Sequence, residues 1–124
     1  MYIKKQKGKI GENIVSKYLI QNNYEIIERN FRCRQGEIDI IAFDIKIKEL
    51  VFIEVKTRSS TKYGRPCEAV GKYKKNHIIS VAEYNNFKNN ISNIPIRFDV
   101  IEVLLNNSYY NINHIKGAFF KINN

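Results

Sequence analysis

Apolar and polar residues along this chain follow two different periods, and the changes of period predict its secondary structure. Residues 8–21 carry an apolar stripe that includes Val15 and Leu19, at the spacing of an amphipathic helix. Asn22-Asn23 is a plausible helix stop. Gly8 and Gly11 weaken the start of this helix, but they permit a close approach of its backbone to a neighbour.

The rest of the chain reads as five strands and a second helix. They are strands at 24–31, 37–43 and 50–58, a helix at about 67–87 that opens at Pro66, and strands at 96–105 and about 109–115. In the second strand, Ile38, Ile40 and Ala42 share one face by alternation. The third strand is mostly apolar on both faces, which predicts a central strand covered on both sides.

These elements predict an α/β fold with the order α-β-β-β-α-β-β. At 124 residues, 44% of them hydrophobic and 27% charged, the chain is expected to form a single domain over residues 1–124. No apolar stretch is long enough to span a bilayer, and the basic N-terminus lacks a signal-peptide pattern, so a cytoplasmic protein with no membrane partner is expected. Cys33 and Cys67 are read as two unrelated reduced thiols.

The charge of the chain favours a polyanionic partner. Its formal net charge is +9 and its pI is near 9.6. The sequence is also rich in Lys, Asn and Ile, the composition expected from an AT-rich gene, and such a bias raises the lysine content without selection for binding. The charge is therefore permissive for nucleic acid and does not by itself establish it.

Two charged residues inside an apolar strand are the most informative feature of the chain. Glu54 and Lys56 interrupt the run that begins at Leu50, and both point to one face, about 6–7 Å apart along the strand. Burying an ionised group is costly unless it is paired or bound to a metal. Upstream, Glu37 and Asp39 repeat the pattern on the preceding strand. If the two strands pair, Asp39, Glu54 and Lys56 meet at one place.

That arrangement is typical of a hard-cation hydrolytic site. Mg²⁺ binds through oxygen ligands and commonly uses one or two protein carboxylates together with waters and substrate phosphate. Asp39 and Glu54 could supply the carboxylates, and Lys56 could hold the attacking water or neutralise charge at phosphorus. Glu12, on the inward edge of the helical stripe, could complete the site or help to bind a second metal.

The competing interpretation is a Glu-Lys pair on a half-exposed strand beside an unrelated acidic strand. Exposed pairs of this kind are common and contribute only about 0–1 kcal/mol. The apolar neighbours Phe52, Ile53 and Val55 argue against full exposure and favour a site. Motifs of three scattered residues give many false positives, so both interpretations stand at this point.

The sequence resembles a known family over nearly its whole length. The matching segments are 11–12, 28–32, 36–42 (Gly-Glu-Ile-Asp-Ile-Ile-Ala), 51–58 (Val-Phe-Ile-Glu-Val-Lys-Thr-Arg), 63–66, 68–70, 74–75 and 97–100. In combination they resemble the PD-(D/E)XK restriction-endonuclease-like nuclease superfamily. Within it they are most similar to the small uncharacterised bacterial YraN-like family, distantly similar to archaeal Holliday junction resolvases. Ile38 stands where many superfamily members have proline.

The resemblance implies a restriction-endonuclease-like core, a mixed β-sheet flanked by helices. It implies that Asp39 and Glu54 are metal ligands, that Lys56 is the catalytic lysine and that Glu12 is the acidic residue of the first helix. It implies Mg²⁺, or Mn²⁺, as the cofactor, and in-line attack by water that leaves a 5′-phosphate.

Basic and other polar residues around this core are weaker candidates. A phosphate-binding rim could be formed by Arg29, Arg32, Arg34 and Arg58, with Lys74 and Lys75, and a scattered solvated surface explains them almost as well. Arg97 and Asp99 share a strand face and are read mainly as a structural ion pair. His77 and His114 lack partners at metal-ligand spacing. Phe31 and Tyr63 could stack on bases, but core or surface roles are commoner.

Three functions remain open from the sequence. The first is a Mg²⁺-dependent DNA endonuclease or related phosphodiesterase, acting on branched or damaged DNA. The second is a non-catalytic nucleic-acid-binding module of the same fold that acts with a DNA-processing partner. The third is an α/β domain with no role in nucleic-acid chemistry. DNA is the expected partner, with RNA as an alternative, and a homodimer would suit branched DNA.

Overall fold

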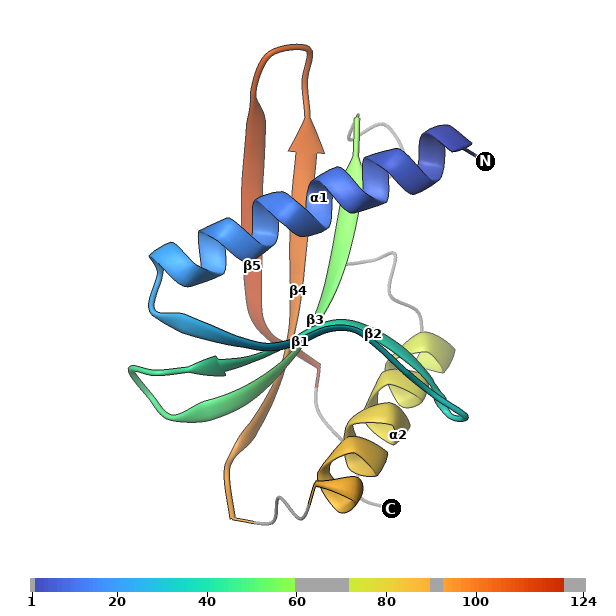
Figure 1. Ribbon diagram of the computed structural model, residues 1–124, viewed down its shortest axis with the longest axis vertical. Helices are drawn as coiled ribbons and strands as arrows, with labels where there is room; N and C mark the ends of the chain where they lie inside the picture. Colours follow the sequence, from blue (N-terminus) through green and yellow to red (C-terminus); the bar gives the residue numbers. More distant parts are fainter. Residues whose placement is uncertain (1, 60–71, 90–92, 120–124) are drawn as a thin grey trace.

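The computed structural model describes residues 2–59, 72–89 and 93–119, and its elements follow the predicted order (Figure 1). They are α1 (Tyr2–Gln21), β1 (Tyr24–Cys33), β2 (Gly36–Asp44), β3 (Glu49–Arg58), α2 (Lys72–Lys88), β4 (Ile96–Leu105) and β5 (Tyr110–Phe119). No helix within these ranges is long and apolar enough to cross a membrane. The predicted start of the second helix, at 67–71, lies outside the described residues, as does Cys67.

The strands form one mixed sheet in the order β1-β2-β3-β4-β5. Strand β2 is antiparallel to both of its neighbours, β1 and β3. Strands β3 and β4 are parallel, and β5 is antiparallel to β4. Strand β3 is therefore central, as its two apolar faces predicted. The α-β-β-β-α-β-β order and the mixed sheet agree with a restriction-endonuclease-like core.

Helix α1 extends further toward the N-terminus than the apolar stripe predicted, because it begins at Tyr2 instead of at residue 8. Its end falls where predicted. Asn23 adopts a left-handed backbone conformation with φ 66°, which asparagine tolerates better than most residues and which commonly ends a helix. The chain then enters β1 at Tyr24.

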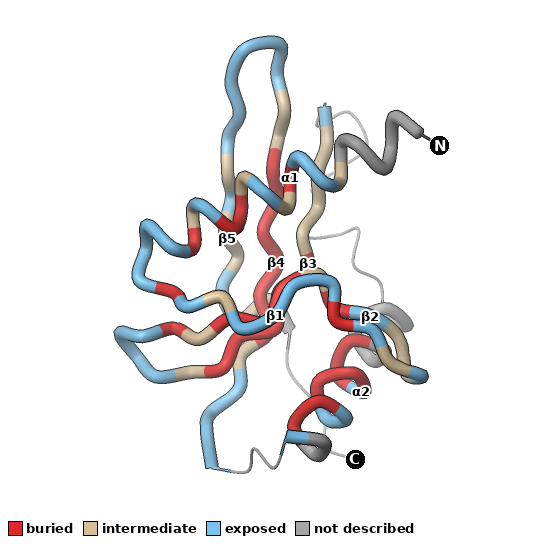
Figure 2. The backbone as a smooth tube through the Cα atoms, viewed as in Figure 1, coloured by how far each residue is buried: buried red, intermediate tan, exposed pale blue. Residues whose placement is uncertain are grey.

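Two apolar clusters cover opposite faces of the sheet (Figure 2). One joins α1 to the sheet through Val15 and Leu19, which are fully buried against residues such as Ile53 and Ile101. The other joins α2 to the sheet and contains Ile78, Ile79, Val81 and Ala82 with Phe52 and Phe98. Phe31 belongs to this second cluster and is 5% exposed, so it has a core role.

The β1–β2 hairpin bends away from the rest of the sheet, and this corrects one prediction. The expectation that Ile38, Ile40 and Ala42 share one face is wrong, because Ile40 and Ala42 pack with α1 whereas Ile38 packs with α2. Pairing between β2 and β3 runs only as far as Ile40 opposite Ile53. Beyond that pair, β2 follows β1 toward α2, as the curved ribbon of the hairpin shows (Figure 1).

Gly11 allows α1 to lie directly on β3. A Cβ atom at this position would collide with the Thr57 side chain, so the helix backbone packs at its closest against the strand there. Gly8 is different, since no described atom lies within 4 Å of the position of its missing Cβ. The close approach predicted for both glycines is therefore found at Gly11 alone. Glu12 is the next residue along the helix.

A buried polar network fixes the other half of α1 to the sheet. Asp99, which is 0% exposed, accepts two hydrogen bonds from the Arg97 guanidinium, at 2.8 and 2.9 Å, and pairs with His114 Nε2 at 2.7 Å. His114 Nδ1 lies 2.8 Å from the Tyr18 hydroxyl of α1. The predicted Arg97–Asp99 ion pair is thus confirmed, and it continues through His114 to the first helix.

A bulge in the β4–β5 ladder makes room for Asp99. The regular register shifts between Phe98 and Val100, and Gly117 takes a φ of 61° opposite the shift. Glycine adopts this conformation at no steric cost. The Gly117 N–H donates to Asp99 Oδ1 at 3.0 Å, so the bulge supplies one of the hydrogen bonds that the buried carboxylate needs.

Candidate metal centre

Strand β3 presents Glu54 and Lys56 side by side on the face that α2 partly covers. The Glu54 side chain is 8% exposed and that of Lys56 25%. Lys56 Nζ lies 3.5 Å from Glu54 Oε1. The competing interpretation of a solvated surface pair therefore does not describe this carboxylate, which is buried among the apolar residues of β3.

Strand β2 brings Asp39 to the same place. Asp39 Oδ2 accepts a hydrogen bond from the backbone N–H of Val55 at 2.8 Å. Val55 lies between Glu54 and Lys56 in the chain, so the contact sets the Asp39 carboxylate against the segment that carries the other two candidates. It falls one residue beyond the last backbone pair of β2 and β3, Ile40 opposite Ile53.

Helix α1 contributes Glu12 from a third direction. Its Oε1 atom is buried and makes no hydrogen bond to any described residue. Burial raises the pKa of Glu12, and the nearby carboxylates Glu37 and Glu54 raise it further. The opposing influence of Arg29 and Arg32 is too small to cancel this. A buried carboxylate oxygen among like charges is stabilised by a proton or by a cation.

These donors fit a cation bound mainly by two carboxylates. Within residues 2–59, 72–89 and 93–119, no three His, Cys, Asp or Glu side chains lie close enough to form a metal cage. Mg²⁺ does not require one, since it keeps several waters and binds through one or two carboxylates plus phosphate. Asp39 is hydrogen-bonded to the residue that follows Glu54, and Glu12 interacts electrostatically with Glu54.

Two of the predicted phosphate-binding residues, Arg32 and Arg58, lie in different parts of the fold. Arg32 is exposed and pairs with Glu37 at 3.3 Å in the β1–β2 hairpin. Arg58 lies at the end of β3, two residues beyond Lys56, where it lines a cavity. Lys74 and Lys75 fall in the first turns of α2, but their side chains lie outside the described residues.

The register also places a residue beside the centre that the sequence analysis did not select. Glu102 of β4 is the direct neighbour of Lys56 in the parallel ladder and is 7% exposed. The sequence contains an indication of this residue, because Glu102 is a single charged residue between Ile101 and Val103, just as Glu54 is a charged residue in an apolar run. What the sequence could not give was the pairing of β3 with β4, which sets Glu102 against Lys56.

The fold and the centre together define a class of protein. It is a mixed α/β domain with a restriction-endonuclease-like core, in which Asp39 is hydrogen-bonded to the segment of β3 that carries the Glu54–Lys56 pair. The chain belongs to the uncharacterised protein family UPF0102, whose family model matches residues 11–103. The match includes Glu12, Asp39, Glu54 and Lys56.

Curated relatives cover almost the whole chain. A UPF0102 protein of Clostridioides difficile is 50% identical over 116 residues, which are 93% of this chain and 97% of the relative. One from Clostridium botulinum is 50% identical over 121 residues, 95% of this chain and 97% of the relative. One from Caldanaerobacter subterraneus is 42% identical over 119 residues, 94% and 96% respectively. These relatives agree with the predicted YraN-like membership.

Proposed function

We propose that this protein is a Mg²⁺- or Mn²⁺-dependent DNA endonuclease, or a related phosphodiesterase, whose centre is formed by Asp39, Glu54 and Lys56. The observation that carries the proposal is the hydrogen bond from Val55 to Asp39. It holds one carboxylate against a strand that carries a second carboxylate and a lysine on one face. Branched or damaged DNA is the substrate class that we propose.

Each residue has a distinct task in this proposal. Asp39 and Glu54 hold the cation, which when bound lowers the pKa of a water and stabilises charge on phosphate. Lys56 offers three N–H donors beside Glu54 and can orient water or neutralise a phosphate oxygen. Glu12 of α1 interacts electrostatically with Glu54, and its buried Oε1 can accept a hydrogen bond from a water.

A cleavage assay on a panel of DNA structures tests this function. We expect Mg²⁺ or Mn²⁺ to support cleavage of at least one member among single strands, duplexes, flaps and four-way junctions. Asp39→Ala and Glu54→Ala should each abolish it, because one missing ligand disables a two-carboxylate centre. The matched control is Glu25→Ala, which removes an exposed carboxylate of β1. Full activity in both centre variants would refute the assignment.

The non-catalytic alternative predicts a different outcome in the same experiments. A binding module of this fold would bind DNA with a log affinity that falls linearly with log salt, and would cleave nothing with any divalent cation. The buried Glu54–Lys56 pair beside Asp39 argues for the enzyme, since carboxylates of this kind suit a bound Mg²⁺ ion. Salt-dependent binding without cleavage across the whole panel would decide for the module.

A further inference from the structure

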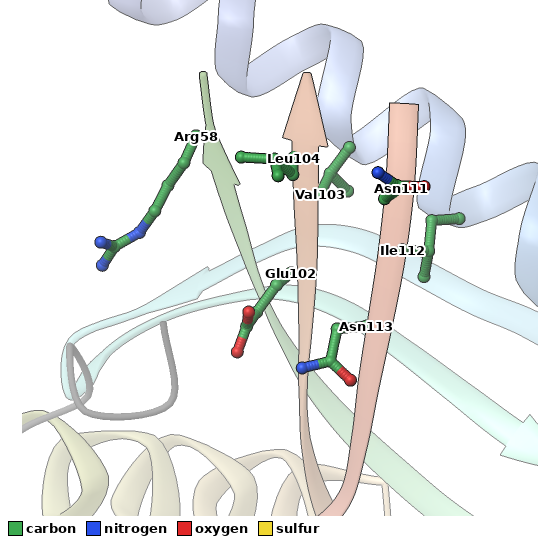
Figure 3. A pocket seen from close by; sticks show the side chains of 7 residues that line it. All are labelled: Arg58, Glu102, Val103, Leu104, Asn111, Ile112 and Asn113. Carbon is green, nitrogen blue, oxygen red and sulfur yellow. The ribbon is translucent and has the colours of Figure 1, made fainter. Parts of the chain in front are cut away.

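Strands β3, β4 and β5 line a cavity of about 290 Å³ next to the candidate centre (Figure 3). Its polar side chains are those of Arg58, Glu102, Asn111 and Asn113, and Leu104 supplies an apolar wall. In the close view, Glu102 and Asn113 extend to the same side of the sheet.

The strand register joins this cavity to the centre. Lys56 is paired with Glu102 in the parallel ladder, and Glu102 is paired with Asn113 in the antiparallel one. Residues paired across a ladder point to the same face of a sheet. Lys56, Glu102 and Asn113 therefore form one row across three strands, and the cavity begins in the row that contains the lysine of the centre.

The next row of the same face adds to the lining, which also includes Val103 and Ile112. Arg58 is paired with Leu104, and Leu104 is paired with Asn111. Rows on one face are two residues apart, which is about 6–7 Å. Arg58 therefore lies one row from Lys56, near the separation of consecutive phosphates along a nucleic-acid strand.

The lining groups match the parts of a nucleotide. Arg58 carries a permanent charge and a planar fork of donors that suits a phosphate. Asn113 offers an amide donor and acceptor, which is the pair of groups that a base edge presents. Glu102 can accept a hydrogen bond from an exocyclic amino group, and Leu104 gives an apolar surface for a ring.

A base inside a duplex could not use these groups, because its edge is already paired and its faces are stacked. Recognition of base edges in a pocket requires an unpaired nucleotide. The volume of the cavity is also near the lower end of the range of about 300–1,000 Å³ for ligand pockets, which suits one nucleotide and not a helix. The net charge of +9 favours a polyanionic strand.

We propose that this cavity binds an unpaired base of a DNA strand, with the adjoining phosphate at Lys56, so that the protein prefers DNA with unpaired nucleotides to continuous duplex. The inference rests on the proposed function for the class of partner, and it adds the structural feature of DNA that is selected. Glu102 and Asn113, with Asn111 beside them in the lining, are the residues that determine this preference, whereas Arg58 contacts a phosphate.

Binding without catalysis provides the test. Fluorescence anisotropy with the full chain, in EDTA, compares a single-stranded oligonucleotide, the blunt duplex of the same sequence, and that duplex with a central unpaired base. Asn113→Leu removes the amide at an exposed position of β5, so the fold should tolerate it. Asn111→Leu is the second variant. Asn93→Leu makes the same change at an exposed residue that precedes β4, outside the cavity.

We expect the unpaired DNAs to bind about tenfold more tightly than blunt duplex, the scale of one good contact to a base edge. Asn113→Leu should remove most of this preference and leave duplex binding unchanged, and Asn93→Leu should leave both unchanged. Equal binding of all three DNAs, or a preference that survives both cavity variants, would overturn the inference. Tighter binding of single-stranded RNA than of DNA would overturn it as well.

This assay separates the inference from the proposed enzyme. A cavity-dependent preference in EDTA supports the inference even if no DNA is ever cleaved, and in that case the endonuclease proposal fails alone. Metal-dependent cleavage of continuous duplex that Asn113→Leu leaves intact would support the endonuclease proposal, and the inference about the cavity would then fail alone.

Discussion

The side chain of Asp39 occupies the place where backbone pairing between β2 and β3 stops, and there it accepts the N–H of Val55 at 2.8 Å. The hydrogen bond gives an acceptor to the Val55 N–H, which lies beyond the last backbone pair of β2 and β3. It also fixes a carboxylate beside the residue that lies between Glu54 and Lys56 in the chain. The bend of the β1–β2 hairpin and the position of the candidate centre therefore have one structural origin.

The two glycines of α1 predict opposite effects on stability. Gly11→Ala should destabilise the protein, because the new methyl group would overlap the Thr57 side chain and push the helix off β3. Gly8→Ala should stabilise it by about 0.5–1 kcal/mol, since its Cβ position meets no described atom and alanine favours the helix. Thermal denaturation of both variants measures this. Equal effects of the two substitutions would contradict the proposed helix–strand contact.

The buried network around Asp99 predicts a large loss of stability when it is broken. Asp99→Ala should cost about 3–5 kcal/mol in the free energy of unfolding, because it leaves a buried part of Arg97 without its principal carboxylate. Glu37→Ala removes a partner from the exposed pair with Arg32 and should cost less than about 1 kcal/mol. Urea denaturation at neutral pH compares them, and similar losses would be inconsistent with this account.

The same carboxylate predicts a pH dependence. Burial opposes the ionisation of Asp99, but hydrogen bonds from His114 and Arg97 outweigh it and hold its pKa below the ordinary 3.8. A lowered pKa stabilises the fold at pH values above 3.8, and this contribution disappears as the pH falls below that value. Unfolding free energies measured from pH 6 down to pH 2 should therefore fall more steeply for the wild type than for Asp99→Asn.

Glu12 predicts a pH dependence of opposite sign. Burial raises its pKa above the ordinary 4.5, so the folded protein binds a proton more tightly than the unfolded chain does. The free energy of unfolding should therefore decrease as the pH rises from 4.5 through the raised pKa of Glu12. The Glu12→Gln variant, which stays neutral, should lack this decrease. A bound cation would offset the cost of the ionised carboxyl, so Mg²⁺ should raise the Tm of the wild type more than that of the variant.

Glu25→Gln is the matched control for this prediction, because Glu25 is exposed on β1. It should follow the wild type in both its pH dependence and its response to Mg²⁺. A Glu12→Gln variant that behaves in the same way as the control would contradict the placement of Glu12 at the centre.

Substitution of Arg58 should change the salt dependence of DNA binding. Each phosphate contact contributes about one to the slope of log affinity against log salt. Arg58→Ala should reduce the magnitude of this slope by about one, as expected for the loss of one phosphate contact. Lys17→Ala removes an exposed cation of α1 and should leave the slope unchanged. Identical slopes for wild type and Arg58→Ala would exclude the contact.

The sequence predicted the fold well because its signals are local. Short apolar segments separated by turn residues located the five strands, the apolar stripe located α1, and the run that is apolar on both faces identified β3 as central. The observed boundaries of the elements differ from the predicted ones where the apolar pattern is weak, as at the N-terminus of α1. The different packing of Ile38 and Ile40 could not be predicted, because it depends on the bend of a hairpin that no residue pattern specifies.

The centre was predictable in part for a similar reason. Charges in apolar strands drew attention to Asp39, Glu54 and Lys56, since burying them is costly without compensation. Glu102 carried the same signal but gained meaning only from the parallel pairing of β3 with β4, which joins residues far apart in the sequence. The link from Tyr18 to Asp99 through His114 likewise depends on tertiary placement.

The most direct test of the central claim is to locate a bound cation. Crystals soaked in Mn²⁺ and measured at the manganese absorption edge should give an anomalous peak between the carboxylates of Asp39 and Glu54, and this peak should be absent from crystals of Asp39→Asn. Such a result would support the metal centre on which the proposed function depends. Manganese bound elsewhere, or a peak that persists at full height in Asp39→Asn, would contradict it.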